Sequence, residues 1–324
     1  MRAGLSGGAL IQIASPNMQA LLKYDVLSVC GPGIAALVDI KLHVNDASSG
    51  RKPFSFPNRP CRVNPGADLM ANVADIQHIL EDLIPLRYAE SWDNVGLLVG
   101  DPAREVRKLL VTVDLTPSVG DEATRLGCDM IVAYHPPLFK PAAKLGPGDP
   151  IWHALSRGIS VWSPHTAFDA VRGGTNDHVA KLLGLSLERP LRPFATEPAL
   201  GQGRVGRFES PAQDLLAGIK QALELDHMLV AGEIPTGSTT LAIAAGSGAS
   251  MLDDARREGA AVMLVGEASH HDALRAQRSG ITLIATLHSR IERPAVRALA
   301  AQLESALPVP VYMSQADAEP YRFV

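Results

Sequence analysis

Two segments of the chain resemble one another, and each ends in a histidine followed four residues later by a carboxylate. The first ends in His165 and Asp169, and the second ends in His288 and Glu292. In both, a polar helix-like stretch leads through Gly-Ile into a β-rich run and then into His-x-x-x-Asp or His-x-x-x-Glu. Imidazole and carboxylate groups are the usual ligands of hydrolytic metal ions. The duplicated pair therefore predicts a metal site built between two related halves.

The similarity extends upstream of these pairs. Residues 121–135 and 253–267 both read as a helix, a glycine, an apolar strand and then a polar residue, which is His135 in one copy and Glu267 in the other. Any β-α-β unit produces some of this likeness, because glycine ends helices and branched residues fill buried strands. The matching His-x-x-x-acid endings favour a true duplication.

The candidate ligands all follow predicted strands. His135, His165 and His288 each come directly after an apolar run. Asp114 and Glu267 also end strands and are candidates for contacts with the ligands or the substrate. In open α/β sheets, ligands bind beyond the carboxyl ends of the strands, so these side chains are expected to converge on one crevice. For a single histidine, the alternative is a structural role in which it only caps a strand.

Strand and helix patterns alternate along most of the chain. Strands are predicted at residues 108–113, 130–134, 159–162, 204–208, 239–244, 261–265, 281–285 and 309–312. Helices are predicted from residue 75 and at residues 118–126, 150–156, 177–183, 212–223, 252–258, 272–277 and 294–306. This alternation predicts an α/β protein with helices on both faces of mostly parallel or mixed sheets.

The prolines at 190, 193 and 198 divide the alternating series in two. We expect a first α/β domain at residues 70–195 and a second at residues 196–324, with the C-terminal helix and strand returning to the first. His165 and Asp169 are expected in a loop. Glu292 is expected at a helix N-terminus, with Pro294 in the first turn.

Residues 1–69 differ from the rest of the chain. They are interrupted by Gly-Pro, Ser-Ser-Gly and Pro-Asn-Arg-Pro and show no sustained hydrophobic period. We expect this segment to be a disordered, dispensable extension or the result of a start codon placed too early. The functional protein would then start near Met70.

Composition narrows the function classes. The chain has 324 residues, of which 46% are hydrophobic and 20% charged, as in folded soluble proteins. A net charge of −4 gives no electrostatic footprint for nucleic acid or anionic membranes. No run approaches the roughly 20 apolar residues of a membrane-spanning helix. Cys30, Cys61 and Cys128 form neither a disulfide framework nor a zinc motif, so a reducing cytoplasm is expected.

Five motifs occur in an order and spacing that resemble a known family. They are Glu-Ser-Trp-Asp-Asn-Val-Gly-Leu-Leu-Val-Gly at 90–100, Tyr-His-Pro-Pro-Leu-Phe at 134–139, Pro-His-Thr-Ala-Phe-Asp at 164–169, Gly-Glu-Ala-Ser-His at 266–270, and His-x-x-x-Glu-Arg at 288–293. From residue 70 to the C-terminus, the chain resembles the NGG-interacting-factor (NIF-three-like) family of dinuclear metal proteins, often labelled GTP cyclohydrolase 1 type 2. The motif Tyr-His-Pro-Pro that begins at Tyr134 and the motif His-Thr-Ala-Phe-Asp that begins at His165 resemble the eukaryotic-type branch of this family.

The resemblance implies two related α/β domains, a dinuclear metal centre in the cleft between them, and a ring-shaped homohexamer. The ligands that carry over are His135, Asp169, His288 and Glu292, with His165 as a further candidate. Catalysis would rest on His135 and Glu292. The implied activity is metal-dependent hydrolysis of a small nucleotide-like substrate.

One residue departs from the family pattern. Many bacterial members have two adjacent histidines where this chain has Tyr134 and His135. The resemblance implies two divalent ions (Zn, Fe, Mn or Co). A neutral tyrosine is a poor metal ligand, so whether the second ion binds depends on this position. The absence of a histidine ligand at position 134 also favours a rival hypothesis, in which the protein is a non-enzymatic metal chaperone, a sensor or an interaction scaffold.

Overall fold

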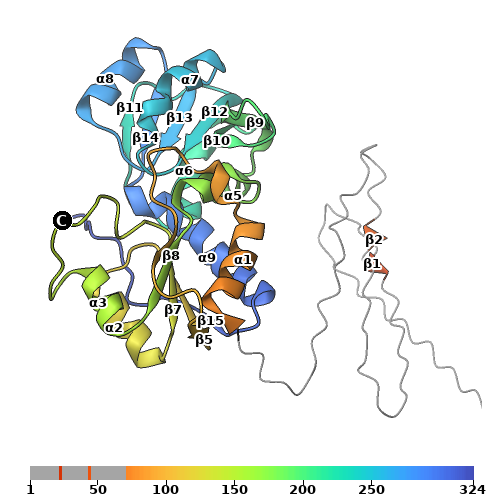
Figure 1. Ribbon diagram of the computed structural model, residues 1–324. Coiled ribbons are helices and arrows are strands. Elements are labelled where there is room, and N and C mark those ends of the chain that lie inside the picture. The colour runs from red at the N-terminus through yellow and green to blue at the C-terminus, as the bar shows by residue number, and fades with distance from the viewer. Residues whose placement is uncertain (1–21, 24–42, 45–70) are drawn as a thin grey trace, which may run out of the picture. The chain divides into compact units, whose positions relative to one another are not determined.

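The computed structural model describes residues 22–23, 43–44 and 71–324. The chain divides into two compact units, Met1–Leu69 and Met70–Val324. In the first unit, β1 (Leu22–Lys23) and β2 (His43–Val44) form a short antiparallel pair. The other residues of 1–69, which we expected to form a disordered extension or to result from a start codon placed too early, lie outside the described residues. Both large sheets belong to the second unit (Figure 1).

One sheet has five strands and a parallel centre. Its order is β15 (Val311–Met313), β6 (Leu109–Thr112), β7 (Met130–Ala133), β8 (Ser160–Ser163) and β4 (Gly96–Val99). The first four strands run parallel to one another, and β4 is antiparallel to β8. The last strand of the chain therefore lies beside β6, more than 190 residues earlier in sequence. A separate short antiparallel pair joins β3 (Ala71–Asn72) to β5 (Glu105–Val106).

The other sheet has six strands and is also mixed. Its order is β11 (Leu229–Ala231), β14 (Thr282–Ala285), β13 (Val262–Val265), β12 (Thr239–Ala244), β10 (Gly201–Phe208) and β9 (Ser186–Pro193). The central strands β12, β13 and β14 are parallel, and the outer pairings are antiparallel. Pro190 and Pro193 lie in β9 at the sheet edge, where a residue without an N–H is tolerated.

The same order of elements occurs in both sheets. β6, α2 (Pro117–Leu126), β7, α3 (Pro150–Ser156) and β8 match β12, α7 (Leu252–Arg257), β13, α8 (His270–Arg278) and β14. The predicted α/β class, with two related halves and mixed sheets flanked by helices, is confirmed. Since parallel strands share a direction, the residues after β7, β8 and β14 lie at corresponding sheet edges.

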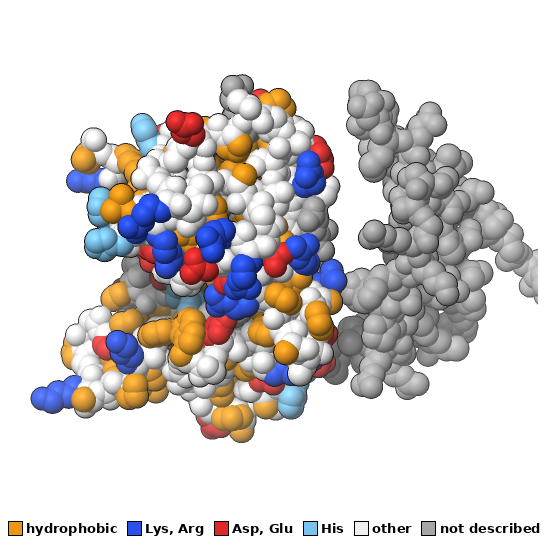
Figure 2. Space-filling view, turned by 90° about the horizontal axis from the view of Figure 1, so that it is seen from above, with side chains coloured by type: hydrophobic (Ala, Val, Ile, Leu, Met, Phe, Trp, Pro, Cys, Tyr) orange, Lys and Arg blue, Asp and Glu red, His pale blue; other side chains and the backbone are white. Residues whose placement is uncertain are grey.

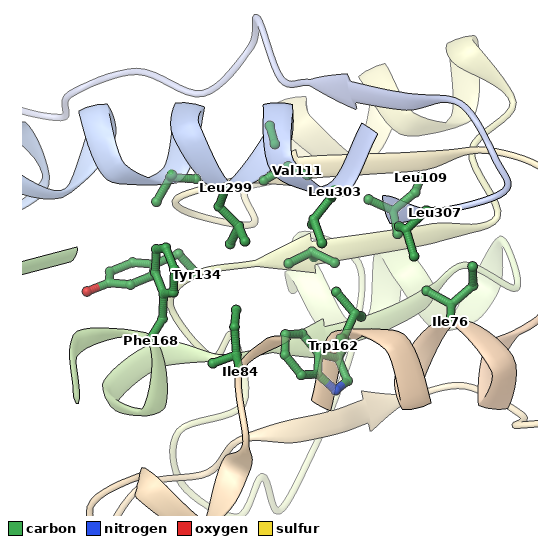
Figure 3. Packing of buried hydrophobic residues seen from close by; sticks show 14 of the residues in the cluster. Ile76, Ile84, Leu109, Val111, Tyr134, Trp162, Phe168, Leu299, Leu303 and Leu307 are labelled. Atoms are coloured by element: carbon green, nitrogen blue, oxygen red, sulfur yellow. The ribbon is translucent and has the colours of Figure 1, made fainter. Parts of the chain in front are cut away.

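The long helix α9 (His288–Ala306) connects the two hydrophobic cores. Its Ile291 packs with residues of the six-stranded sheet, whereas Leu299 and Leu303 pack with the five-stranded sheet. Figure 3 shows these two leucines facing the same cluster as Ile76 of α1 (Val73–Leu83). The remaining helices are η1 (Leu86–Tyr88), α4 (His165–Ala170), α5 (Thr175–Leu182), α6 (Ala212–Ala222) and η2 (Gly248–Met251).

The expectation that His165 and Asp169 lie in a loop is wrong, because both belong to α4. Pro164 at the N-cap provides no capping side chain. Instead, the Asp93 carboxylate accepts a hydrogen bond from the Thr166 N–H at 3.1 Å. A cap supplied from 73 residues away leaves no local sequence signal. The two ligand candidates therefore share one helical face at i and i+4.

The start of α9 also differs from the prediction. The helix begins at His288, so Glu292 lies in its second turn and Pro294 lies inside it. Contacts with the C-terminal segment hold the first turn. The Ser289 hydroxyl donates to Glu319 at 2.6 Å, and Arg293 pairs with Asp317 at 2.8 Å. Long-range contacts of this kind outweigh the local tendency of proline to mark a helix start.

Within the part of the chain that the structure describes, every helix is either too short or too polar to cross a lipid bilayer.

Glu122 of α2 ties down the C-terminal segment and gives the fold a pH dependence. It accepts hydrogen bonds from the Ser314 hydroxyl at 2.5 Å and from the N–H groups of Gln315 and Ala316 at 3.1 Å. Burial acts to raise the pKa of Glu122, but these hydrogen bonds outweigh it and lower the pKa below its usual value. The stabilisation is therefore complete above the unfolded-state pKa and is lost as the pH falls through the folded-state pKa.

Glu122→Gln is expected to lower the free energy of unfolding by about 1.5–3 kcal/mol at neutral pH, the range for hydrogen bonds to a charged group. The difference from wild type should shrink as the pH falls through the lowered folded-state pKa of Glu122, below which the wild-type carboxylate is protonated too. Urea denaturation at a series of pH values measures both quantities. An equal difference at every pH would contradict the assignment.

Candidate metal centre

His135 follows β7 and is oriented by an acidic partner. Its backbone N–H donates to the Val113 carbonyl, which continues the strand pairing by two residues. Its Nδ1 lies 2.8 Å from Oδ1 of Asp114, which comes two residues after the neighbouring strand β6. The Nε2 atom is thereby directed away from Asp114, and it lies 3.2 Å from Oε2 of Glu292.

His165, at the start of α4, has the same kind of partner. Its Nδ1 lies 2.8 Å from Oδ1 of Asp93, whose side chain is completely buried. The other Asp93 oxygen accepts hydrogen bonds from the N–H and hydroxyl of Thr166. His165 has a positive φ of 32°, an uncommon conformation for a residue other than glycine, and Asp93 holds it there.

His288, at the start of α9, completes the pattern. Its Nδ1 lies 3.1 Å from Oε1 of Glu267, and the Ser247 hydroxyl donates to the same oxygen at 2.6 Å. The Nε2 of His288 lies 3.4 Å from Oε1 of Glu292. Each of the three histidines thus has a carboxylate at Nδ1. Metal-binding histidines show this arrangement, because the carboxylate fixes the ring and leaves the other nitrogen to the ion.

Glu292 lies between two of these histidines. One ring nitrogen each of His135 and His288 and one Glu292 oxygen all lie within 4.8 Å of one another. Glu292 is 2% exposed, yet its Oε2 has no hydrogen-bond partner, and neither has the Nε2 of His135. Buried polar atoms without partners are costly. Two such atoms 3.2 Å apart fit a cation shared between them.

The electrostatics of His135 favour positive charge at the same point. Burial disfavours its charged form, but the carboxylates of Asp114 and Glu292 outweigh burial and raise the pKa of His135 to about 10. The surroundings therefore stabilise a cation beside Glu292. A divalent metal ion satisfies the same requirement, and mixed imidazole and carboxylate ligands suit Zn, Fe, Mn or Co. The residues present fit a metal ion.

Asp169 lies near this cluster and is held by Tyr134. The Tyr134 hydroxyl is buried and donates to Oδ1 of Asp169 at 2.6 Å. Figure 3 shows this hydroxyl pointing away from the aliphatic side chains that surround the ring. Burial, together with the charge of Glu292, raises the pKa of Asp169. Tyr134 therefore does not face the cluster as a ligand, and its hydroxyl positions the carboxylate of Asp169 instead.

Gly246 brings the backbone close to the cluster. It follows β12 and has a φ of +61°. A Cβ atom there would lie 2.7 Å from Oε1 of Glu292 and 3.3 Å from Nε2 of His288. Any larger residue would push into the two ligand candidates, so this position requires glycine.

A cavity of about 380 Å³ opens beside the cluster, a size suited to a small molecule. His165 and Asp169 of α4 line it together with His288 and Glu292 of α9. His135 lies behind this lining, with its Nε2 buried.

The structure brings together most of the residues predicted from the sequence. His135, His288 and Glu292 form one cluster, and His165 and Asp169 line the same cavity. The rings of His135 and His165 are 5.6 Å apart. His270 and His271, the first two residues of α8, are exposed. Asp93 was not among the predicted site residues, although it lies in the motif at 90–100.

Comparisons with known proteins agree with the fold and the motifs. The model of the family described as Duf34/NIF3 (NGG1p interacting factor 3) matches residues 71–320. A GTP cyclohydrolase 1 type 2 homolog of Clostridium acetobutylicum is 31% identical over 263 residues, covering 78% of this chain and 98% of that protein. NIF3-like protein 1 of Drosophila melanogaster is 33% identical over 255 residues, with 74% and 85% covered. The crystal structure of a Staphylococcus aureus hypothetical protein matches with a TM-score of 0.71 and 26% identity, over 79% of this chain and 100% of that one.

Proposed function

Since the chain belongs to the Duf34/NIF3 family, and since three carboxylate-held histidines converge on one cavity, we propose that it is a dinuclear metal-dependent hydrolase acting on a nucleotide-like substrate. The observation that carries the proposal is the placement of Glu292. One of its oxygens faces His135 at 3.2 Å, and the other faces His288 at 3.4 Å. A carboxylate between two separate imidazoles is suited to bridge two ions.

We assign the ligands around that bridge. His135 and Asp169 belong to one ion and His288 to the other, with His165 as a further ligand. The Tyr134 hydroxyl donates a hydrogen bond to Oδ1 of Asp169. The occupancy of the second ion therefore depends on how Tyr134 holds this carboxylate.

The protein's own residues prepare the site for hydrolysis. Asp114, Glu267 and Asp93 keep the three imidazoles in place with their Nε2 atoms free of these carboxylates. We assign the catalytic roles to His135 and Glu292, the residues that meet at the buried end of the cluster. When bound, divalent ions supply Lewis-acid polarisation of substrate and an activated water. Such a centre suits attack on a polarised ring carbon or a phosphoester.

The proposed partners are a small-molecule substrate and further copies of the chain, as the hexameric ring of the family resemblance implies. We propose no nucleic-acid or membrane partner. Figure 2 shows Lys and Arg side chains on one face with Asp and Glu side chains among them, a mixed surface instead of a single-sign stripe. The cytoplasm is the proposed compartment, and Cys128 is a free, buried thiol. Sedimentation velocity of the purified chain tests the hexamer.

The hydrolase and the metal carrier give different results in one experiment. Purified protein is analysed for metal and then incubated with a panel of nucleotides, and the products are separated by chromatography. The hydrolase retains its metal on dilution and shows turnover, which His288→Ala abolishes. His271→Ala, an exposed histidine outside the cavity, is the matched control and should keep full activity. Readily exchanged metal without turnover on any nucleotide would instead favour the metal chaperone.

A further inference from the structure

Two exposed aromatic rings stand at the rim of the metal cavity. Trp92 is 59% exposed and Phe139 is 46% exposed, and both line the cavity. Their ring centroids are 5.8 Å apart in an edge-to-face arrangement, and each lies 6.3 Å from the ring of His165. Large aromatic side chains are usually buried, so two exposed together at a cavity rim indicate a binding surface.

The backbone that carries these rings is fixed. Trp92 precedes Asp93, whose buried carboxylate holds both His165 and Thr166. The Asn94 side chain donates to the carbonyl of Leu138, the residue before Phe139, which joins the two loops directly. The rings are thus exposed without being on free loops. A preorganised aromatic surface loses little conformational freedom when a ligand binds.

The cavity lining also has polar residues and one positive side chain. It includes Ser247, Gly248 and Ser250, and Arg192 is the only Lys or Arg among the described residues that line the cavity. Its Nη2 and Nε atoms contact Asp254, and the side chain is 47% exposed. The aromatic pair at the rim and Arg192 therefore line the same cavity as the metal cluster.

We propose that Trp92 and Phe139 form a stacking site for the planar heteroaromatic ring of the substrate, and that Arg192 binds its anionic group. The proposal rests on the proposed hydrolase function and adds the residues that would recognise the ring and the anionic group of such a nucleotide-like substrate. Both rings present a π-face or an edge to solvent, and either can contact a flat ring. Stacking tolerates different bases, so the site selects for ring and charge and not for one base.

The test uses the full-length, metal-loaded protein and three probes: GMP, guanosine and ribose 5-phosphate. Dissociation constants are measured by calorimetry. Trp92→Ala and Phe139→Ala are each expected to weaken GMP and guanosine binding about 10-fold or more and to leave ribose 5-phosphate binding unchanged. Arg192→Gln should weaken GMP and ribose 5-phosphate binding but not guanosine binding. Trp152→Ala, an exposed tryptophan on α3 outside the cavity lining, is the matched control and should bind all three probes like wild type.

The proposal is overturned if Trp92→Ala binds GMP as tightly as wild type, or if it loses ribose 5-phosphate binding in equal proportion. It is also overturned if metal-loaded wild type binds none of the ring-containing probes. Metal content of each variant, expected to equal that of wild type, excludes damage to the cluster as the cause. A wild type that binds GMP through Trp92 but never turns over a nucleotide refutes the hydrolase proposal and leaves the stacking site standing.

Discussion

Glu292→Gln is expected to lower the affinity of the site for metal by more than about 100-fold. Changes to residues that merely orient a ligand cost about 10–100-fold in affinity. Glu292 itself lies between the Nε2 atoms of His135 and His288, and its Oε2 has no other partner. Glutamine keeps the shape of the side chain but removes the negative charge and one of the two ligand oxygens. Metal content after dialysis, measured by mass spectrometry, gives the result directly.

Glu304→Gln is the matched control for this variant. Glu304 lies on the same helix, α9, and is exposed, so it should retain wild-type metal content. The circular dichroism of both variants should equal that of wild type, since glutamine fits where glutamate does. Retention of stoichiometric metal by Glu292→Gln would exclude Glu292 as the bridging ligand.

Arg293→Met is expected to lower the free energy of unfolding by about 3–5 kcal/mol, the range for breaking a buried ion pair on one side. The side chains of Arg293 and Asp317 are 10% and 1% exposed, and two of their N–O contacts measure 2.8 and 3.2 Å. Asp317 also accepts a hydrogen bond from the Val113 N–H. The variant leaves the Asp317 carboxylate buried without its cation. Urea denaturation measures the loss.

Arg297→Met provides the comparison, one turn further along α9. Arg297 pairs with Glu224 at 3.2 Å, but the two side chains are 53% and 66% exposed. Exposed pairs contribute about 0–1 kcal/mol, so this variant should unfold almost like wild type. Equal losses in the two variants would mean that the pair of Arg293 and Asp317 does not hold the C-terminal segment against α9.

Hydrophobic periodicity was sufficient to predict the α/β class and most central elements. Buried strands such as β7 and β13 are continuous apolar runs, and their ends locate His135 and Glu267 without any tertiary information. The convergence of His135, His165 and His288 follows from the rule that ligands bind beyond the carboxyl ends of parallel strands. The predicted partners Asp114 and Glu267 contact His135 and His288 for the same reason.

Contacts between distant segments account for what the sequence did not reveal. The start of α4 depends on Asp93, and the first turn of α9 depends on contacts with Asp317 and Glu319. Tyr134 is a further case, because only the packed structure places its hydroxyl against Asp169. Such interactions join residues tens of positions apart and leave no periodic signal in the sequence.

Anomalous X-ray diffraction from crystals grown with Mn²⁺ or Zn²⁺ tests the central claim most directly. We predict a peak next to Glu292, within coordination distance of a His135 or His288 Nε2 atom, about 2.0–2.2 Å for imidazole or carboxylate ligands of zinc. A second peak beside Asp169 would establish the dinuclear form despite Tyr134. A map with no peak at Glu292, or with metal only at the exposed His270 and His271, would contradict the account.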